Sequence, residues 1–255
     1  MSEYLRPLSP SSVNTFCNCP HSFKLKYIDG IKFPSGEAAA FGSCIHKVLE
    51  KFWDEYVAGE DVEKAIQESV NKYWDKNITD EYDEAAHDCL NHAISIIKER
   101  SSMMPLYTEY SCVNDANNTI AIIDLVIPGK IIDYKTSKVY TVKAKQPNIV
   151  QATMCSMNLE HKTGQIIREV EFEYLRWGKY QRVFITDEMI EDMNILISKV
   201  RTDIENDVFP KNEKSCWFCD YSLLCKADKR ALERYSKKAE EKTCKKFLVQ
   251  TVLRL

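Results

Sequence analysis

Two aspartates and a lysine lie in a short stretch that has the pattern of a β-hairpin. Two apolar, β-rich segments flank Pro128-Gly129, a dipeptide that favours a tight turn because proline pre-sets φ and glycine accepts a positive φ. A hairpin closed symmetrically about this pair places Asp124 directly opposite Asp133. Lys135 then shares a face with Asp133, because side chains alternate along a strand.

The charges of Asp124, Asp133 and Lys135 indicate what chemistry this group could perform. Two carboxylates that face each other in an apolar sheet repel and are costly to remove from water. We therefore expect a bound cation, and Mg²⁺ prefers oxygen ligands of this kind. A lysine beside such a metal can position a water molecule or stabilise developing negative charge. The alternative is a surface hairpin with solvated charges.

Three cysteines near the end of the chain have a spacing typical of metal or cluster ligation. Cys216, Cys219 and Cys225 form a C-x₂-C-x₅-C cluster, but a tetrahedral thiolate site needs a fourth ligand. The candidates for it are Cys17, Cys19 and Cys244. Zinc and iron–sulfur clusters both use thiolates, so spacing alone does not separate them. The alternative is a group of buried thiols without metal.

Two further polar residues have ordinary explanations when each is taken alone. His46 lies at the border of the apolar stripe of a helix predicted for residues 37–58, where a histidine is more often a packed residue than a ligand. Gln151 follows Asn148 by three residues and could complete a capping box. The chain has no G-x-S-x-G, G-x-x-x-x-G-K or G-x-G-x-x-G motif, which argues against a serine hydrolase and a P-loop motor.

Hydrophobic periodicity predicts the elements that must position these residues. Helices are expected over residues 9–28 (two short helices broken at Pro20), 37–58, 60–76, 81–101, 148–160, 187–208 and near 226–242; strands are expected over 106–113, 119–127, 131–136, 170–177 and 180–186. This order of helices, three strands, helix, two strands and helix predicts an α/β fold with a helical N-terminal part.

Composition indicates an ordinary globular protein, with 44% hydrophobic and 29% charged residues. We find neither a signal-peptide pattern nor a membrane-spanning run, and we expect a cytoplasmic protein without a membrane partner. Ten cysteines in such a chain indicate reduced thiols or metal ligation. Of the net charge of −3, residues 226–246 carry +5 (nine Lys/Arg, four Asp/Glu), which leaves −8 elsewhere. This basic segment either contacts phosphates or forms a solvated helix face.

Several short motifs follow one another in a specific order. They are Cys19-Pro20, Gly42-x-x-x-His46, Ile123-Asp124, Ile132-Asp133-Tyr134-Lys135-Thr136, Gln151, and finally Cys216, Cys219 and Cys225. This order resembles the RecB-type branch of the PD-(D/E)XK nuclease superfamily. It is most similar to the iron–sulfur members, the CRISPR-associated RecB-like exonucleases and the nuclease domain of AddB. The resemblance covers about residues 9–228. One departure is Cys155, where the family usually has a tyrosine.

The resemblance implies a role for each motif residue. The implied fold is α/β, a mixed central sheet flanked by helices with a helical N-terminal insert and a Cys-ligated C-terminal segment. The implied ligands of a catalytic Mg²⁺ or Mn²⁺ are His46, Asp124, Asp133 and the carbonyl of Tyr134. Lys135 would position the attacking water and Gln151 would orient the site or the substrate. The implied ligands of a [4Fe–4S] cluster, with Zn²⁺ as the alternative, are Cys19, Cys216, Cys219 and Cys225.

The implied function is that of a metal-dependent DNA exonuclease. It would cut at DNA ends, on single strands, in recombination, repair or CRISPR spacer processing, with a helicase or a CRISPR integration complex as partner. We expect one nuclease domain over 1–255, with a helical part (9–105), a core (106–208) and a cluster-binding loop with a basic helix (209–255). The alternatives are a non-catalytic iron–sulfur or zinc DNA-binding subunit of such a complex, and a purely structural zinc protein.

Overall fold

The computed structural model describes residues 6–33, 36–100, 104–143 and 145–225 of the chain. They fall into two compact units, which we call the cysteine unit (11–33 and 198–225) and the sheet unit (6–10 and 36–197). The basic segment 226–246, with its expected helix and Cys244, lies outside the described residues, and the single domain over 1–255 stays a prediction. No helix in the described ranges is long and apolar enough to cross a membrane.

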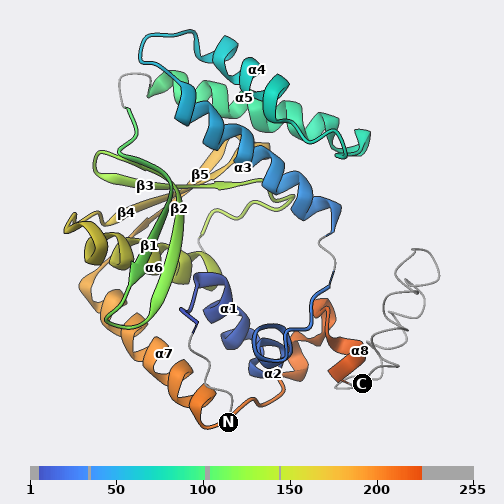
Figure 1. The fold of residues 1–255 in the computed structure, drawn as a ribbon, viewed down its shortest axis with the longest axis vertical. Coiled ribbons are helices and arrows are strands. Elements are labelled where there is room, and N and C mark those ends of the chain that lie inside the picture. Colours follow the sequence, from blue (N-terminus) through green and yellow to red (C-terminus); the bar gives the residue numbers. More distant parts are fainter. Residues whose placement is uncertain (1–5, 34–35, 101–103, 144, 226–255) are drawn as a thin grey trace. The chain divides into compact units, whose positions relative to one another are not determined.

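One mixed sheet of five strands organises the described part of the sheet unit (Figure 1). The strands are adjacent in chain order: β1 (Tyr107–Asn114), β2 (Thr119–Ile127), β3 (Lys130–Lys135), β4 (Glu169–Tyr174) and β5 (Lys179–Phe184). Neighbours are antiparallel except β3 and β4, which are parallel. A parallel pair needs a long crossover, and α6 (Gln146–Thr163) supplies it. The predicted α/β fold and its element order are confirmed.

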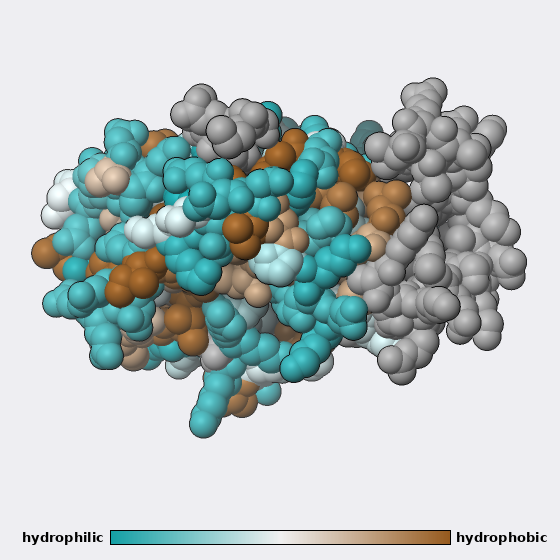
Figure 2. Space-filling view, turned by 90° about the horizontal axis from the view of Figure 1, so that it is seen from below, coloured by the Kyte–Doolittle hydropathy of each residue, from teal (hydrophilic) through white to brown (hydrophobic). Residues whose placement is uncertain are grey.

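Helices cover both faces of this sheet and create two cores (Figure 1). On one face lie α3 (Glu37–Glu55), α4 (Val62–Tyr73) and α5 (Asp83–Glu99), whose apolar stripes bury side chains such as Ile45 and Phe52. On the other face α6 packs against β1 and β2. The coloured part of the surface in Figure 2 is mainly hydrophilic, with apolar side chains scattered among the polar ones.

The β2–β3 hairpin has the register that its turn predicts. Ile127 pairs with Lys130, and the pairing continues through Leu125 and Ile132. The two-residue turn at Pro128-Gly129 is therefore confirmed. The next position along this register sets Asp124 against Asp133, at the point where the hydrogen-bonded ladder ends.

The cysteine unit is built from both ends of the described chain. It contains most of α1 (Pro10–Asn18), then α2 (Pro20–Phe23), a π-helical turn (Lys24–Ile28), the last residues of α7 (Asp187–Glu205), a 3₁₀ helix (Glu213–Phe218) and α8 (Ser222–Cys225). The expected break at Pro20 is confirmed, because α1 ends at Asn18 and Cys19 is the N-cap of α2. Phe16, Phe23 and Phe209 form its aromatic core.

Gly178, in the turn between β4 and β5, allows a stability test of how α5 packs against this turn. Its φ is +54°, and an added Cβ would lie 2.6 Å from the His92 ring of α5. Gly164 also has a positive φ, of +74°, but its Cβ would meet nothing within 4 Å. Gly164→Ala should therefore cost only backbone strain, about 1 kcal/mol, and Gly178→Ala about 2–3 kcal/mol because the clash is added. Urea unfolding of both variants measures the difference, and equal losses would contradict the observed packing.

Candidate active site

Three side chains from three elements meet at one point of the sheet unit. His46 comes from α3, Glu109 from β1 and Asp124 from β2, and one ligand atom of each lies within 4.8 Å of the other two. His46 Nδ1 is 3.4 Å from Asp124 Oδ2. Because an imidazole nitrogen and two carboxylates are a common set of ligands for divalent metals, this group is a candidate metal centre.

Glu109 was not among the residues that we selected from the sequence. Asn114 pairs with Thr119 in the β1–β2 hairpin, and five residues back along β1 and five residues forward along β2 set Glu109 opposite Asp124. The register of this hairpin, which the structure supplies, is the signal that identifies Glu109. Glu109 also has a φ of +41°, an unusual conformation for a residue with a side chain.

The position of Asp124 depends on a change of face along β2. Ile123 is buried in the core on the α6 side, whereas Leu125 is buried on the α3 side. Residues two apart on a regular strand share a face, so the alternation reverses at Asp124. Such irregularities often redirect side chains next to active sites. The redirected carboxylate accepts a hydrogen bond of 2.7 Å from the backbone N–H of Tyr134.

Asp133, Lys135 and Gln151 form a second group beside this point. Lys135 Nζ lies 2.5 Å from Asp133 Oδ2 and donates to Gln151 Oε1 at 2.9 Å. Gln151 Nε2 in turn donates to Asp133 Oδ1 at 2.5 Å. Asp133 Oδ2 is buried, and its polar contact among the described residues is the ion pair with Lys135. A carboxylate oxygen has more than one lone pair, so Asp133 Oδ2 could also bind a cation.

The capping-box explanation of Gln151 is wrong. Helix α6 begins at Gln146 with Lys145 as its N-cap, so Gln151 lies beyond the capping positions. Asn148, the other member of the supposed box, donates instead to Tyr174 and Gln181. The alternative of a solvated surface hairpin also fails, because Asp133 is only 7% exposed.

A close helix–strand approach holds His46 over the end of β3. Gly42 lies one helical turn before His46, and a Cβ at Gly42 would come within 2.9 Å of Thr136 Oγ1. A larger residue would therefore push α3 away from the chain that follows β3. This contact gives a physical reason for the Gly42-x-x-x-His46 spacing.

The pKa values of His46, Asp133 and Glu109 are all raised. Burial lowers the pKa of His46, but the contact with Asp124 and the nearby carboxylates outweigh it and raise that pKa to about 9. Burial, supported by the charge of Asp124 and opposed by Lys135, raises the pKa of Asp133 to about 6. Burial and Asp124 also raise the pKa of Glu109. Part of each shift comes from neighbouring carboxylates, and a divalent cation would neutralise that negative charge.

Lys135 is held in its charged form by the same environment. Burial lowers its pKa, but the adjacent Asp133 carboxylate outweighs burial and leaves the pKa above the usual value. Lys135 is therefore a hydrogen-bond donor at neutral pH and not a base. Cys155, at the position where the family usually has tyrosine, is buried and its pKa is raised well above the usual value, chiefly by burial.

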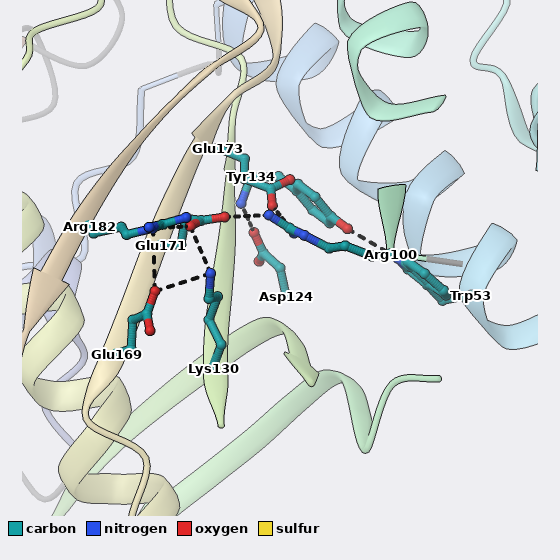
Figure 3. A network of polar contacts seen from close by, with 9 residues as sticks. All are labelled: Trp53, Arg100, Asp124, Lys130, Tyr134, Glu169, Glu171, Glu173 and Arg182. Carbon is teal, nitrogen blue, oxygen red and sulfur yellow. Dashed lines mark hydrogen bonds and ion pairs between the residues drawn. The ribbon is translucent and has the colours of Figure 1, made fainter. Parts of the chain in front are cut away.

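On the α3–α5 side of the sheet, a network of ion pairs lies next to the Tyr134 side chain (Figure 3). The Tyr134 hydroxyl accepts a hydrogen bond of 3.1 Å from Trp53 Nε1. Next to it, Arg100 donates to both Glu171 and Glu173, which are 0% and 1% exposed. The network continues to Lys130, Arg182 and Glu169. Tyr134 thus has its backbone at the candidate site and its side chain in this network.

The four predicted thiol ligands lie in the cysteine unit, and Cys19 and Cys216 are close enough to Cys219 to affect its pKa. The backbone N–H of Asn212 donates to Cys19 Sγ at 3.4 Å, and the Asn212 side chain donates to the carbonyl of Asn18. Burial raises the pKa of the Cys219 thiol, and the nearby Cys19 and Cys216 raise it further. Cys19 is buried whereas Cys17 is exposed, which favours Cys19 over Cys17 as a fourth ligand.

Comparison with protein families places this geometry in a known context. The family model of the PD-(D/E)XK nuclease superfamily matches residues 7–226. The chain belongs to the PD-(D/E)XK nuclease superfamily. No curated protein matches the chain. Members of this superfamily are typically nucleases that use divalent metals, and the nitrogen and oxygen donors described above fit such an ion.

The raised pKa of His46 gives a prediction for the metal-free protein. A group whose pKa rises from 6.5 to about 9 on folding stabilises the fold fully below pH 6.5, and this stabilisation disappears as pH rises through about 9. His46→Gln should therefore be less stable than wild type at pH 7 by up to about 3 kcal/mol, and the gap should close by pH 10. Urea unfolding in EDTA at each pH measures the gap, and a gap that widens with pH would contradict the prediction.

Proposed function

We propose that the protein is a metal-dependent DNA exonuclease of the RecB-like type. The observation that carries this proposal is the convergence of His46, Glu109 and Asp124 beside the Asp133–Lys135–Gln151 group. The first group offers ligands to a cation, and the second offers a protonated lysine next to it. Both are parts that phosphodiester hydrolysis needs.

The ligands that we propose for the ion are His46, Asp124, Asp133 and the Tyr134 carbonyl, with Glu109 added from the structure. Mg²⁺ or Mn²⁺, when bound, supplies Lewis-acid stabilisation of phosphate charge and a more acidic water. His46 must lose its proton to become a ligand, so metal binding should release protons. The imidazole nitrogen makes Mn²⁺ at least as effective as Mg²⁺.

Lys135 and Gln151 act on the reacting atoms in this proposal. The Lys135 ammonium lies beside Asp133 and can donate to a water or to a phosphate oxygen as negative charge develops. Gln151 accepts from Lys135 and donates to Asp133, so it holds both side chains in one orientation. A water placed by Lys135 in line with the scissile bond would attack the phosphorus while the P–O bond to the leaving deoxyribose oxygen breaks. The attacking water would lose a proton to solvent, and the leaving oxygen would take one up.

We also propose a substrate and partners for the protein. We infer that it cuts DNA ends, on single strands, in recombination, repair or CRISPR spacer processing. A helicase or a CRISPR integration complex would supply such ends. The superfamily match supports DNA as substrate.

We propose a [4Fe–4S] cluster on Cys19, Cys216, Cys219 and Cys225, with zinc as the alternative. Thiolates on one zinc ion lie about 3.8 Å apart, given Zn–S bonds of about 2.3 Å. Among the described residues no three cysteine sulfurs lie within 4.8 Å of one another. No three of them therefore lie as close together as the thiolates of one zinc ion do. An N–H donor to sulfur, such as that of Asn212 to Cys19, is a common second contact at such sites.

Substitutions at the two groups separate metal binding from catalysis. Asp133→Asn and Glu109→Gln should weaken Mn²⁺ binding and lower the cleavage rate at least about a hundredfold, because each removes a charged ligand. Lys135→Ala should lower the rate by about 10²–10³-fold with metal affinity kept, because lysine is not a ligand. End-labelled single-stranded DNA measures cleavage, and calorimetry with Mn²⁺ measures binding.

Asp187→Asn is the matched control, because this carboxylate is exposed and lies outside both groups. It should leave both measurements unchanged. Full activity of Asp133→Asn would overturn the proposed nuclease site. DNA binding by the wild type without cleavage in Mg²⁺ or Mn²⁺ would favour the non-catalytic subunit.

The cysteines give a second test with a matched pair. Protein purified without oxygen should be brown, and Cys19→Ser should remove the visible absorption whereas Cys17→Ser should not. The cluster would join segments almost 200 residues apart and contribute roughly 4–5 kcal/mol by the cross-link relation. Cys219→Ser should therefore also become sensitive to protease near residues 19 and 216.

Three outcomes would change this assignment. Colour lost in Cys17→Ser and kept in Cys19→Ser would make Cys17 the fourth ligand. Colour lost in Cys244→Ser would move that role to Cys244. A colourless protein with stoichiometric zinc would replace the iron–sulfur cluster and keep the four-cysteine tether.

A further inference from the structure

Two segments of the sheet unit contain basic residues and no acidic ones. Residues 134–159 hold four lysines and residues 174–186 hold two arginines and one lysine, with neither Asp nor Glu in either segment. The whole chain has a net charge of −3. A separation of charge this strong in an acidic chain marks a surface that attracts anions.

The two segments lie against each other. Trp177 Nε1 donates to the carbonyl of Ser137 at 3.4 Å, and the Tyr140 hydroxyl donates to the carbonyl of Tyr180 at 3.4 Å. Lys179 Nζ lies 5.4 Å from the centre of the Tyr140 ring. The loop after β3 and the start of β5 therefore form one continuous surface.

This surface begins next to the candidate active site. Lys135 pairs with Tyr174 across β3 and β4, and Tyr174 pairs with Lys179 across β4 and β5. Two strand spacings separate Lys135 from Lys179, about 10 Å. Tyr140 packs edge-on against Tyr174 at 5.1 Å between ring centres, which places the loop on the same face as Lys135.

The groups on this surface are available to a ligand. Lys143, Lys145 and Lys179 are exposed, and none of them forms an ion pair with another described residue. Trp177 is 46% exposed although it is a large apolar side chain. The arginines are engaged elsewhere, since Arg182 pairs with Glu171 and Arg176 lies over Phe41.

We propose that this basic–aromatic surface binds single-stranded DNA next to the cleavage site. Lys143, Lys145 and Lys179 contact phosphates, and the Trp177 indole stacks on an unpaired base. Lysines along a backbone path together with an exposed aromatic ring are the groups that bind single strands without sequence preference. Bases in a duplex are already stacked and paired, so Trp177 selects the single strand. This inference rests on the proposed nuclease function and deepens it.

The test measures binding in EDTA, where cleavage does not interfere. Fluorescence anisotropy with a labelled oligothymidine should show affinity about tenfold or more lower for Trp177→Leu and largely kept for Trp177→Phe. Affinity for a duplex of mixed sequence should be unchanged in both variants. Lys143→Ala/Lys145→Ala/Lys179→Ala should reduce the slope of log affinity against log salt by about 2. The control Lys64→Ala/Lys72→Ala/Lys76→Ala removes the same charge from α4 and the residues just after it, outside the basic–aromatic surface, and should match the wild type.

The outcomes distinguish this surface from the nuclease site. With Mn²⁺ present, the lysine triple variant should show a raised KM and a nearly unchanged kcat on single strands. Unchanged affinity, salt slope and KM in an active triple variant would overturn the surface and leave the nuclease function standing. Equal losses in the two lysine triple variants, or equal effects of Trp177→Leu on single strands and duplex, would also overturn it. A wild type that binds through this surface but never cleaves would remove the nuclease function alone.

Discussion

The hydrogen bond from the backbone N–H of Tyr134 to the carboxylate of Asp124 is the contact around which the sheet unit is arranged. It extends the β2–β3 pairing beyond the point where the ladder ends, and it places Asp124 beside His46. The Tyr134 hydroxyl accepts a second hydrogen bond from Trp53 of α3, the helix that also carries His46. A shift of β3 would therefore disturb both hydrogen bonds, and this gives the candidate ligands a rigid base.

The charge network next to Tyr134 and the candidate site differ in how their charges balance. In the network three carboxylates meet three cations, so the negative charges of buried Glu171 and Glu173 are paired. At the candidate site the carboxylates of Glu109, Asp124 and Asp133 meet the cation of Lys135 and, when it is protonated, that of His46. A divalent ion bound to neutral His46 would bring the sum −3 + 1 + 2 to zero. The same imbalance that raises the pKa of His46 in the metal-free protein is thus what a metal would remove.

The proposed cluster and the candidate metal centre lie in different units of the chain. The contacts of Asn212 with Asn18 and Cys19 join residues 194 and 193 positions apart. Such a long loop is costly to close by weak contacts alone, which is a physical reason for a covalent cluster at that place. The candidate metal ligands and Lys135 all lie in the sheet unit, so none of them is among the residues that such a tether would join.

The local sequence determined a large part of this protein. Helix and strand periodicity gave the element order, the Pro128-Gly129 turn gave the β2–β3 register, and motif spacing selected Asp124, Asp133 and Lys135. Tertiary structure decided the rest. Glu109 became a candidate ligand through the register of the β1–β2 hairpin. Gln151 does not cap α6 and instead donates a hydrogen bond to Asp133. Arg100 and Glu173 meet across more than 70 residues, and no periodicity encodes such a contact, because it depends on how α5 packs on the sheet.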